Sequence, residues 1–126
     1  MTDIRYLLDS NICIYFLAGQ PFKLRSLVVA AEQHIAVSSV SYAEVMLGAV
    51  RVGAAEVAVA TRFFGSLTVC PFDQIAADAY ARLPFRRGRF DRLIAAHALA
   101  MGVTLITNDA ADFADIPGLK IENWAA

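Results

Sequence analysis

Short apolar runs alternate along the chain with longer segments in which apolar residues recur at every third or fourth position. The short runs have the length of buried strands, and they predict strands near residues 4–8, 34–38, 68–71, 103–107 and 119–122. The longer segments predict a helix that follows residue 10 and further helices over about 22–33, 41–52, 54–66, 74–83 and 90–101. This alternation is typical of a three-layer α/β/α domain with a short, mostly parallel central sheet, and we expect residues 1–126 to form that single domain.

Acidic residues stand where predicted strands end and predicted helices begin. Asp9 directly follows the first strand, and Asp109 comes shortly after the fourth. The C-terminal ends of parallel strands share one edge of a sheet, which is where α/β folds bind ligands. Glu44 and Asp91 lie near the starts of their predicted helices, so we expect all four acids to meet at that edge.

Each acid also has a purely structural explanation. Asp9 can cap the helix that follows it, and Glu44 completes a capping box with Ser41. Asp91 falls in the first turn of its helix, where the helix dipole favours a negative charge. The short turn after the fourth strand has two candidate caps, which are Asp109 and Asp112. Taken one at a time, these acids do not establish a site.

The predicted convergence of the acids is what favours a site. Carboxylates brought together without partners repel one another, and the pKa of at least one of them must rise. A divalent cation removes this cost, and oxygen ligands of this kind suit Mg²⁺ or Mn²⁺. A metal in this position can activate water and stabilise the leaving oxygen when a phosphodiester backbone is cut. We therefore predict a metal-dependent nuclease, with RNA as the expected substrate.

Small polar residues flank the acids. They can position metal-bound water or phosphate, or they can serve the turns and caps in which they lie. These residues are Ser10, Asn11, Thr107 and Asn108. Neither His34 nor His97 has the spacing of a zinc ligand. We expect His97 to be a packed residue or a donor that orients one of the ligands.

The composition predicts an apolar surface that binds a partner or a second copy of the chain. The hydrophobic fraction of 58% exceeds the usual value of about 45–50%, which indicates apolar surface for a partner or a second copy. The longest apolar run, residues 12–18, is far shorter than the ~20 residues of a membrane span, and the N-terminus lacks a signal-peptide pattern. Cys13 and Cys70 lie in apolar surroundings without metal-ligand spacing, as in a reduced, cytoplasmic protein.

The net charge of −1 conceals a local cluster of arginines. A basic patch of this density can hold phosphate or can simply remain solvated. The cluster consists of Arg82, Arg86, Arg87, Arg89 and Arg92.

Five segments, in register along nearly the whole chain, resemble the PIN-domain ribonucleases of the VapC toxin group. They are Leu7-Leu-Asp9-Ser-Asn11, Ser38-Ser-Val-Ser-Tyr-Ala-Glu44, Phe90-Asp-Arg-Leu-Ile-Ala-Ala-His97, Leu105-Ile-Thr-Asn-Asp-Ala-Ala-Asp-Phe113, and Ile116-Pro-Gly-Leu119 with Glu122-Asn-Trp124. The resemblance implies the toxin of a type II toxin–antitoxin pair, an endoribonuclease that depends on Mg²⁺ or Mn²⁺. It also implies homodimers, and hetero-oligomers in which a small VapB-like antitoxin binds an apolar groove.

By this resemblance, Asp9, Glu44 and Asp91 match the first three catalytic acids of the family. The fourth is Asp109 or Asp112, because family members differ in where this acid stands. We favour Asp109, which lies nearer the strand end, with Asp112 in support. The expected metal ligands are Asp9, Asp91 and Asp109.

The arginine-bearing loop gives a separate hypothesis about the substrate. This loop closely precedes the helix that carries the third acid, so its side chains are placed to grip RNA phosphates beside the site. The residues concerned are Arg86, Arg87 and Arg89.

Other functions fit parts of the sequence. A receiver-type phosphoacceptor domain has a similar length and an acidic Mg²⁺ pocket, but it needs a lysine after its last core strand. The only lysines here are Lys23 and Lys120. A non-catalytic binding module on the PIN fold would keep the acids only as caps, and DNA cleavage is a further alternative within the nuclease class. A single sequence carries no readable code for which RNA is cut.

Overall fold

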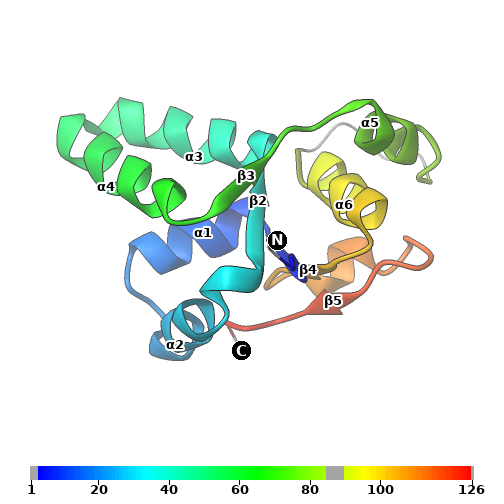
Figure 1. Cartoon of the computed structure of the whole chain (residues 1–126), viewed down its shortest axis with the longest axis horizontal. Coiled ribbons are helices and arrows are strands. Elements are labelled where there is room, and N and C mark those ends of the chain that lie inside the picture. Colours follow the sequence, from blue (N-terminus) through cyan, green and yellow to red (C-terminus); the bar gives the residue numbers. More distant parts are fainter. Residues whose placement is uncertain (1–2, 85–89, 126) are drawn as a thin grey trace.

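The computed structural model describes residues 3–84 and 90–125 of the chain (Figure 1). Its central sheet has five parallel strands in the order β3-β2-β1-β4-β5. The strands are β1 Tyr6–Leu8, β2 Ile35–Ser38, β3 Thr68–Cys70, β4 Thr104–Ile106 and β5 Ile121–Glu122. The helices are α1 Ser10–Leu17, α2 Phe22–Ala30, α3 Ser39–Val52, α4 Ala54–Gly65, α5 Gln74–Ala81 and α6 Phe90–Met101, with 3₁₀ turns η1 Glu32–His34 and η2 Ala110–Phe113.

The predicted alternation of strands and helices is confirmed, with differences at the ends of elements. The second helix ends at Ala30 rather than near residue 33, and the tighter turn η1 then leads into β2. Helix α3 starts two residues earlier than predicted. The reason is its cap, because the hydroxyl of Ser38 accepts a hydrogen bond from the N–H of Val40 at 3.1 Å.

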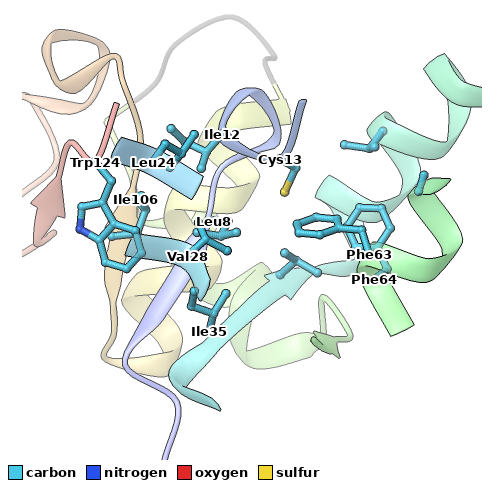
Figure 2. Packing of buried hydrophobic residues seen from close by; sticks show 13 residues of the cluster. Leu8, Ile12, Cys13, Leu24, Val28, Ile35, Phe63, Phe64, Ile106 and Trp124 are labelled. Atoms are coloured by element: carbon cyan, nitrogen blue, oxygen red, sulfur yellow. The ribbon is translucent and has the colours of Figure 1, made fainter. Parts of the chain in front are cut away.

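Two buried clusters make the sheet the middle of three layers. Successive residues of a strand face opposite sides of a sheet, and Leu7 and Leu8 of β1 accordingly join different clusters. Leu8 packs with residues of α1 to α4, including Ile12 (Figure 2). Leu7 packs on the other face with Ile94 of α6 and Phe113 of η2. The predicted α/β/α layering is therefore confirmed.

The strand order tests one of the alternative functions, the receiver-type phosphoacceptor domain. Receiver-type sheets have the order 2-1-3-4-5, whereas here β1 lies between β2 and β4. The receiver-type alternative is therefore wrong for this chain. The chain winds outward from β1 through β2 and β3, and then crosses to β4 on the other side of β1. The C-terminal ends of β1 and β4 thus form the topological switch point, where such sheets bind ligands.

Within the described residues, no single helix is long and apolar enough to cross a membrane. Helices α1 and α2 reach that length and composition only when counted together, and they are bent by 107° relative to each other. Helix α1 buries Ile12 and Cys13 in the core.

Candidate functional site

Asp9 lies at the switch point, one residue beyond the end of β1. Its backbone N–H donates to the carbonyl of Ile106 at 3.0 Å, which continues the pairing of β1 with β4. Thr107, the next residue of that segment, donates its hydroxyl to Asp9 Oδ2 at 2.7 Å. The N–H of Asn11 donates to Oδ1 at 3.0 Å. Asp9 therefore caps α1, as its structural explanation predicted, and its carboxylate is also fixed from the side of β4.

Burial changes the acid–base chemistry of Asp9. The residue is only 5% exposed, and this burial raises the pKa of its carboxyl above the ordinary value. The hydrogen bonds from Thr107 and Asn11 oppose the rise in the Asp9 pKa, while the negative charge of Asp91 adds to it. An ionised Asp9 is thus held at a free-energy cost that a neighbouring cation would remove.

Glu44 reaches the same place from α3. The capping-box explanation for this residue is wrong, because Ser38 caps α3 and Ser41 already lies inside the helix. The Ser41 hydroxyl is buried and lies 3.5 Å from the carbonyl of Leu8. Glu44 instead accepts a hydrogen bond of 2.6 Å from the hydroxyl of Ser10. This bond ties the Glu44 carboxylate to the first residue of α1.

Asp91 joins this group from the first turn of α6, as predicted. Its Oδ1 atom is buried and has no hydrogen-bond partner among the described residues. Asp9, Glu44 and Asp91 line a single hollow of about 490 Å³. The other residues of its lining are Ser10, Asn11, Tyr80, Phe90 and Leu93. A buried carboxylate oxygen without a partner is destabilising unless a ligand satisfies it.

Asp109 and Asp112 belong to the η2 region, and neither is among the residues that line the hollow. Asp109 occupies the cap position of η2, but its side chain makes no capping bond, so the capping explanation fails for this residue. A hydrogen bond with the Asp112 side chain raises the pKa of Asp109, and the charge of Asp91 acts in the same direction. The N–H of Asp109 donates to the Thr107 hydroxyl at 3.1 Å. Thr107 therefore links this acid pair to the carboxylate at the switch point.

The acids fit a divalent metal of the Mg²⁺ class. Within residues 3–84 and 90–125, no three His, Cys, Asp or Glu side chains are grouped tightly enough to hold an ion by themselves. Mg²⁺ does not need such a group, because it keeps several waters and binds through one or two carboxylates together with substrate phosphate. A hollow lined by acids, one with an unpartnered carboxylate oxygen, matches this mode of binding.

The four small polar residues predicted to support the acids differ in their contacts. Ser10 and Thr107 each donate a hydrogen bond to an acid. Asn11 lines the hollow and also donates its N–H within the α1 cap. The side-chain amide of Asn108 instead donates to the hydroxyl of Tyr15 at 3.1 Å.

His97 is a packed residue, as expected. It is 3% exposed, and burial lowers the pKa of its imidazole. Its Nδ1 lies 2.8 Å from the hydroxyl of Ser38, and its ring meets Phe72 edge-on. Because Ser38 caps α3, this contact joins the helix that carries Glu44 to the helix that carries Asp91.

The arginine cluster is only partly described by the structure. Arg86, Arg87 and Arg89 lie outside the described residues. Arg92 does not belong to an exposed basic patch, because its side chain is 4% exposed and pairs with Asp115 at 3.0 Å. The sequence did not predict this ion pair. The available signal was the position of Arg92 on the otherwise apolar face of its helix.

Comparison with known proteins gives matches over nearly the whole chain. The family description "PIN domain" matches residues 6–119, a span that contains all five acids described above. The chain is 31% identical to the tRNA(fMet)-specific endonuclease VapC of Salmonella typhimurium, with 96% of this chain and 98% of that protein covered. It is 32% identical to Ribonuclease VapC2 of Rickettsia felis, with 94% and 97% covered.

Solved structures show the same fold. A DNA-bound VapBC from Salmonella typhimurium superimposes with a TM-score of 0.88 at 28% identity, covering 96% of this chain and 98% of that chain. VapBC2 from Rickettsia felis, bound to a DNA fragment from its promoter, gives a TM-score of 0.85 at 29% identity, with 96% and 99% covered.

Proposed function

Since the chain belongs to the PIN-domain family, we propose that it is a divalent-metal-dependent endoribonuclease and the toxin of a type II toxin–antitoxin pair. The names of its relatives, a tRNA-specific endonuclease and a ribonuclease, support the reaction class. The VapBC structures among its neighbours support the antitoxin partner. The observation that carries the proposal is the convergence of Asp9, Glu44 and Asp91 on one hollow at the switch point. A cytoplasmic location is part of the proposal.

Mg²⁺ or Mn²⁺ is the metal that these residues would hold. Asp9 and Asp91 would be its first ligands, and Asp109 would join them directly or through water, with Asp112 in support. When bound, such a metal lowers the pKa of a coordinated water and stabilises the leaving oxygen. Glu44, which Ser10 holds in place at the wall of the hollow, orients the attacking water.

Thr107 and Asn11 keep Asp9 ready for this role. Their hydrogen bonds stabilise the charged carboxylate in a place where burial disfavours it. Because the two donors come from different sides, the carboxylate is also fixed in direction before substrate arrives. Arginines 86, 87 and 89 remain the proposed grip on RNA phosphates.

An apolar hollow beside α1 supports the antitoxin part of the proposal. It measures about 390 Å³, and its lining residues come from α1, α3 and α4. Ile14, Val52 and Val59 line it and remain 48%, 70% and 50% exposed. Exposed apolar surface of this kind marks protein interaction sites. Glu44 lines this hollow as well as the acidic one, so an antitoxin bound here would lie next to the site.

A second apolar surface supports pairing of two copies of the chain. Leu47 and Phe90 are 55% and 60% exposed, and they line a further hollow of about 340 Å³. This hollow adjoins the acidic one, because Glu44 and Phe90 line both. The antitoxin and the second copy would then cover different parts of the apolar surface that the composition indicated.

An RNA cleavage assay with Mg²⁺ or Mn²⁺ tests the proposed activity. We expect Asp9→Asn and Asp91→Asn each to reduce the rate at least about 100-fold, since even residues that only orient a metal ligand reach this scale. Asp78→Asn is the matched control, because Asp78 is exposed on α5 and does not line the hollow. It should retain wild-type activity.

The outcomes separate the remaining alternatives. Equal cleavage by the wild type and both site variants would end the metal-nuclease proposal. Wild-type protein that binds RNA without cutting it would favour the non-catalytic binding module. Cleavage of single-stranded DNA at the same rate as RNA would favour a nuclease without sugar preference.

A further inference from the structure

Arg92 joins three segments of the chain close to the acids. It follows Asp91 on α6, and its Nη1 and Nη2 atoms donate to the two carboxylate oxygens of Asp115, each at 3.0 Å. Nη1 also donates to the backbone carbonyl of Asp112 at 3.3 Å, and Nη2 donates to the carbonyl of Pro84 at 3.0 Å. One buried guanidinium therefore holds η2 and the segment after α5 against the start of α6.

These bonds bear on the relative position of the acids. Asp91 is carried by α6, whereas Asp109 and Asp112 belong to the η2 region. Phe113 packs η2 into the same apolar cluster as α6, but apolar burial is non-directional and constrains orientation less than hydrogen bonds do. The bidentate pairing of Arg92 is directional. It therefore sets the orientation of the acid-bearing side of η2 relative to Asp91.

We propose that Arg92 is a positioning residue of the metal site, which holds the acid pair of η2 at a fixed distance from Asp91. This inference rests on the proposed function, because it concerns the same metal. It also makes Asp115 part of the support, since Asp115 accepts two of the four bonds that hold the guanidinium.

The positive charge of Arg92 by itself would weaken metal binding, whereas a positioning role would strengthen it. Its guanidinium interacts electrostatically with Asp91, and a positive charge in that position repels a second cation. Removing this charge should strengthen metal binding unless the geometry that Arg92 imposes matters more. The sign of the effect therefore distinguishes positioning from simple electrostatics.

The affinity of the RNA-free protein for Mn²⁺, measured by isothermal titration, tests the inference. Arg92→Gln removes both the charge and the geometry, whereas Arg92→Lys keeps the charge but loses the bidentate pairing. We expect both variants to bind Mn²⁺ at least about tenfold more weakly, the scale found when a partner that orients a metal ligand is lost. Arg51→Gln, at an exposed position in the last turn of α3, is the matched charge control and should bind as the wild type does.

The outcomes distinguish this inference from the proposed function. If the wild type binds Mn²⁺ and cleaves RNA, unchanged or tighter binding by both Arg92 variants would overturn the positioning role alone. A wild type that neither binds Mn²⁺ nor cleaves RNA in its presence would overturn the proposed function, and the positioning role with it. Circular dichroism checks that the variants fold. If Arg92→Gln does not fold, Asp115→Asn replaces it in the titration.

Hydrogen exchange gives a readout that does not depend on metal. We expect the amides of residues 109–116 to exchange faster in Arg92→Lys than in the wild type, while the amides of β1 and β4 keep their protection. Equal exchange of residues 109–116 in the two proteins would count against the positioning role of Arg92.

Discussion

The two clusters of buried charge in this chain are balanced in different ways. Arg92 is almost fully buried, yet its guanidinium donates four hydrogen bonds, two of them to the carboxylate of Asp115. The acidic hollow gathers Asp9, Glu44 and Asp91, and no Lys or Arg is among the described residues that line it. In the first cluster the opposite charges pair with each other, whereas in the second an oxygen of Asp91 has no hydrogen-bond partner within residues 3–84 and 90–125.

This difference distinguishes a charge cluster with a structural role from one that binds a ligand. Removing one partner of a buried ion pair is strongly destabilising, because the other charge is left buried without compensation. A group of like charges without a counter-ion weakens the fold, so the chain keeps it only where a ligand provides the missing charge. The two clusters should therefore respond with opposite sign when a charge is removed from each of them.

The largest expected change in stability belongs to the Arg92 cluster. Arg92→Met removes the guanidinium and should lower the free energy of unfolding of the metal-free protein by about 3 kcal/mol. This is the lower end of the range for buried pairs, because the Asp115 side chain is 26% exposed. Urea denaturation measures the change. Arg51→Met, the exposed control, should stay within about 0.5 kcal/mol of the wild type.

The double variant Arg92→Met with Asp115→Leu sharpens this result. Removing both charges leaves no unpaired carboxylate, so part of the lost stability should return. A double variant that is as unstable as the sum of the single variants would mean that the two residues do not act as a pair.

A cation should stabilise only the acidic hollow. Mg²⁺ or Mn²⁺ at one hundred times its dissociation constant should raise the free energy of unfolding of the wild type by about 2.7 kcal/mol. Thermal unfolding with and without metal measures this gain. Asp91→Asn should abolish most of it, whereas Asp78→Asn should keep it. An equal gain in all three proteins would place the bound cation somewhere other than the hollow.

The fold was predictable from local patterns because its elements have clear ends. Helix α6 has the predicted bounds, since Gly102 adopts a positive φ of 69° that ends it. Helix α5 begins at Gln74, as predicted, because the side chain of Asp73 accepts from the N–H of Ala76 and caps it. The predicted start of α3 was wrong because Ser38 and Ser41 are equally suitable caps in the sequence. Only the position of the strand end decides between two such serines.

The acids were predictable for a similar reason, but their partners were not. Asp9 directly follows β1 and Asp91 lies in the first turn of α6, and such positions are visible in the sequence. The bond from Thr107 to Asp9 joins residues 98 positions apart, and it depends on the register of two parallel strands. The pairing of Arg92 with Asp115 spans 23 positions and depends on how η2 packs on α6. No local pattern identifies the partners in such contacts, so the sequence placed Arg92 in a basic patch that could hold phosphate or remain solvated.

The smallest predicted effect is also the one that most directly tests the charge balance at Asp9. Asp9→Asn should make the metal-free protein more stable at pH 7, by less than the changes expected above, while it abolishes cleavage. Asparagine caps a helix about as well as aspartate does, so the α1 cap survives. What the variant removes is the cost of keeping a buried carboxylate ionised beside Asp91.

The pH dependence of this effect has a definite sign. Because the pKa of Asp9 is raised in the folded protein, the folded state holds its proton more tightly than the unfolded state, whose pKa is about 3.9. The stability of the wild type therefore falls as pH rises from about 4 through the folded pKa of Asp9. The advantage of Asp9→Asn should be absent below pH ~4 and should grow to a plateau above that pKa. Urea denaturation across this pH range measures the advantage, and a variant that is less stable than the wild type at pH 7 would show that capping outweighs charge at Asp9.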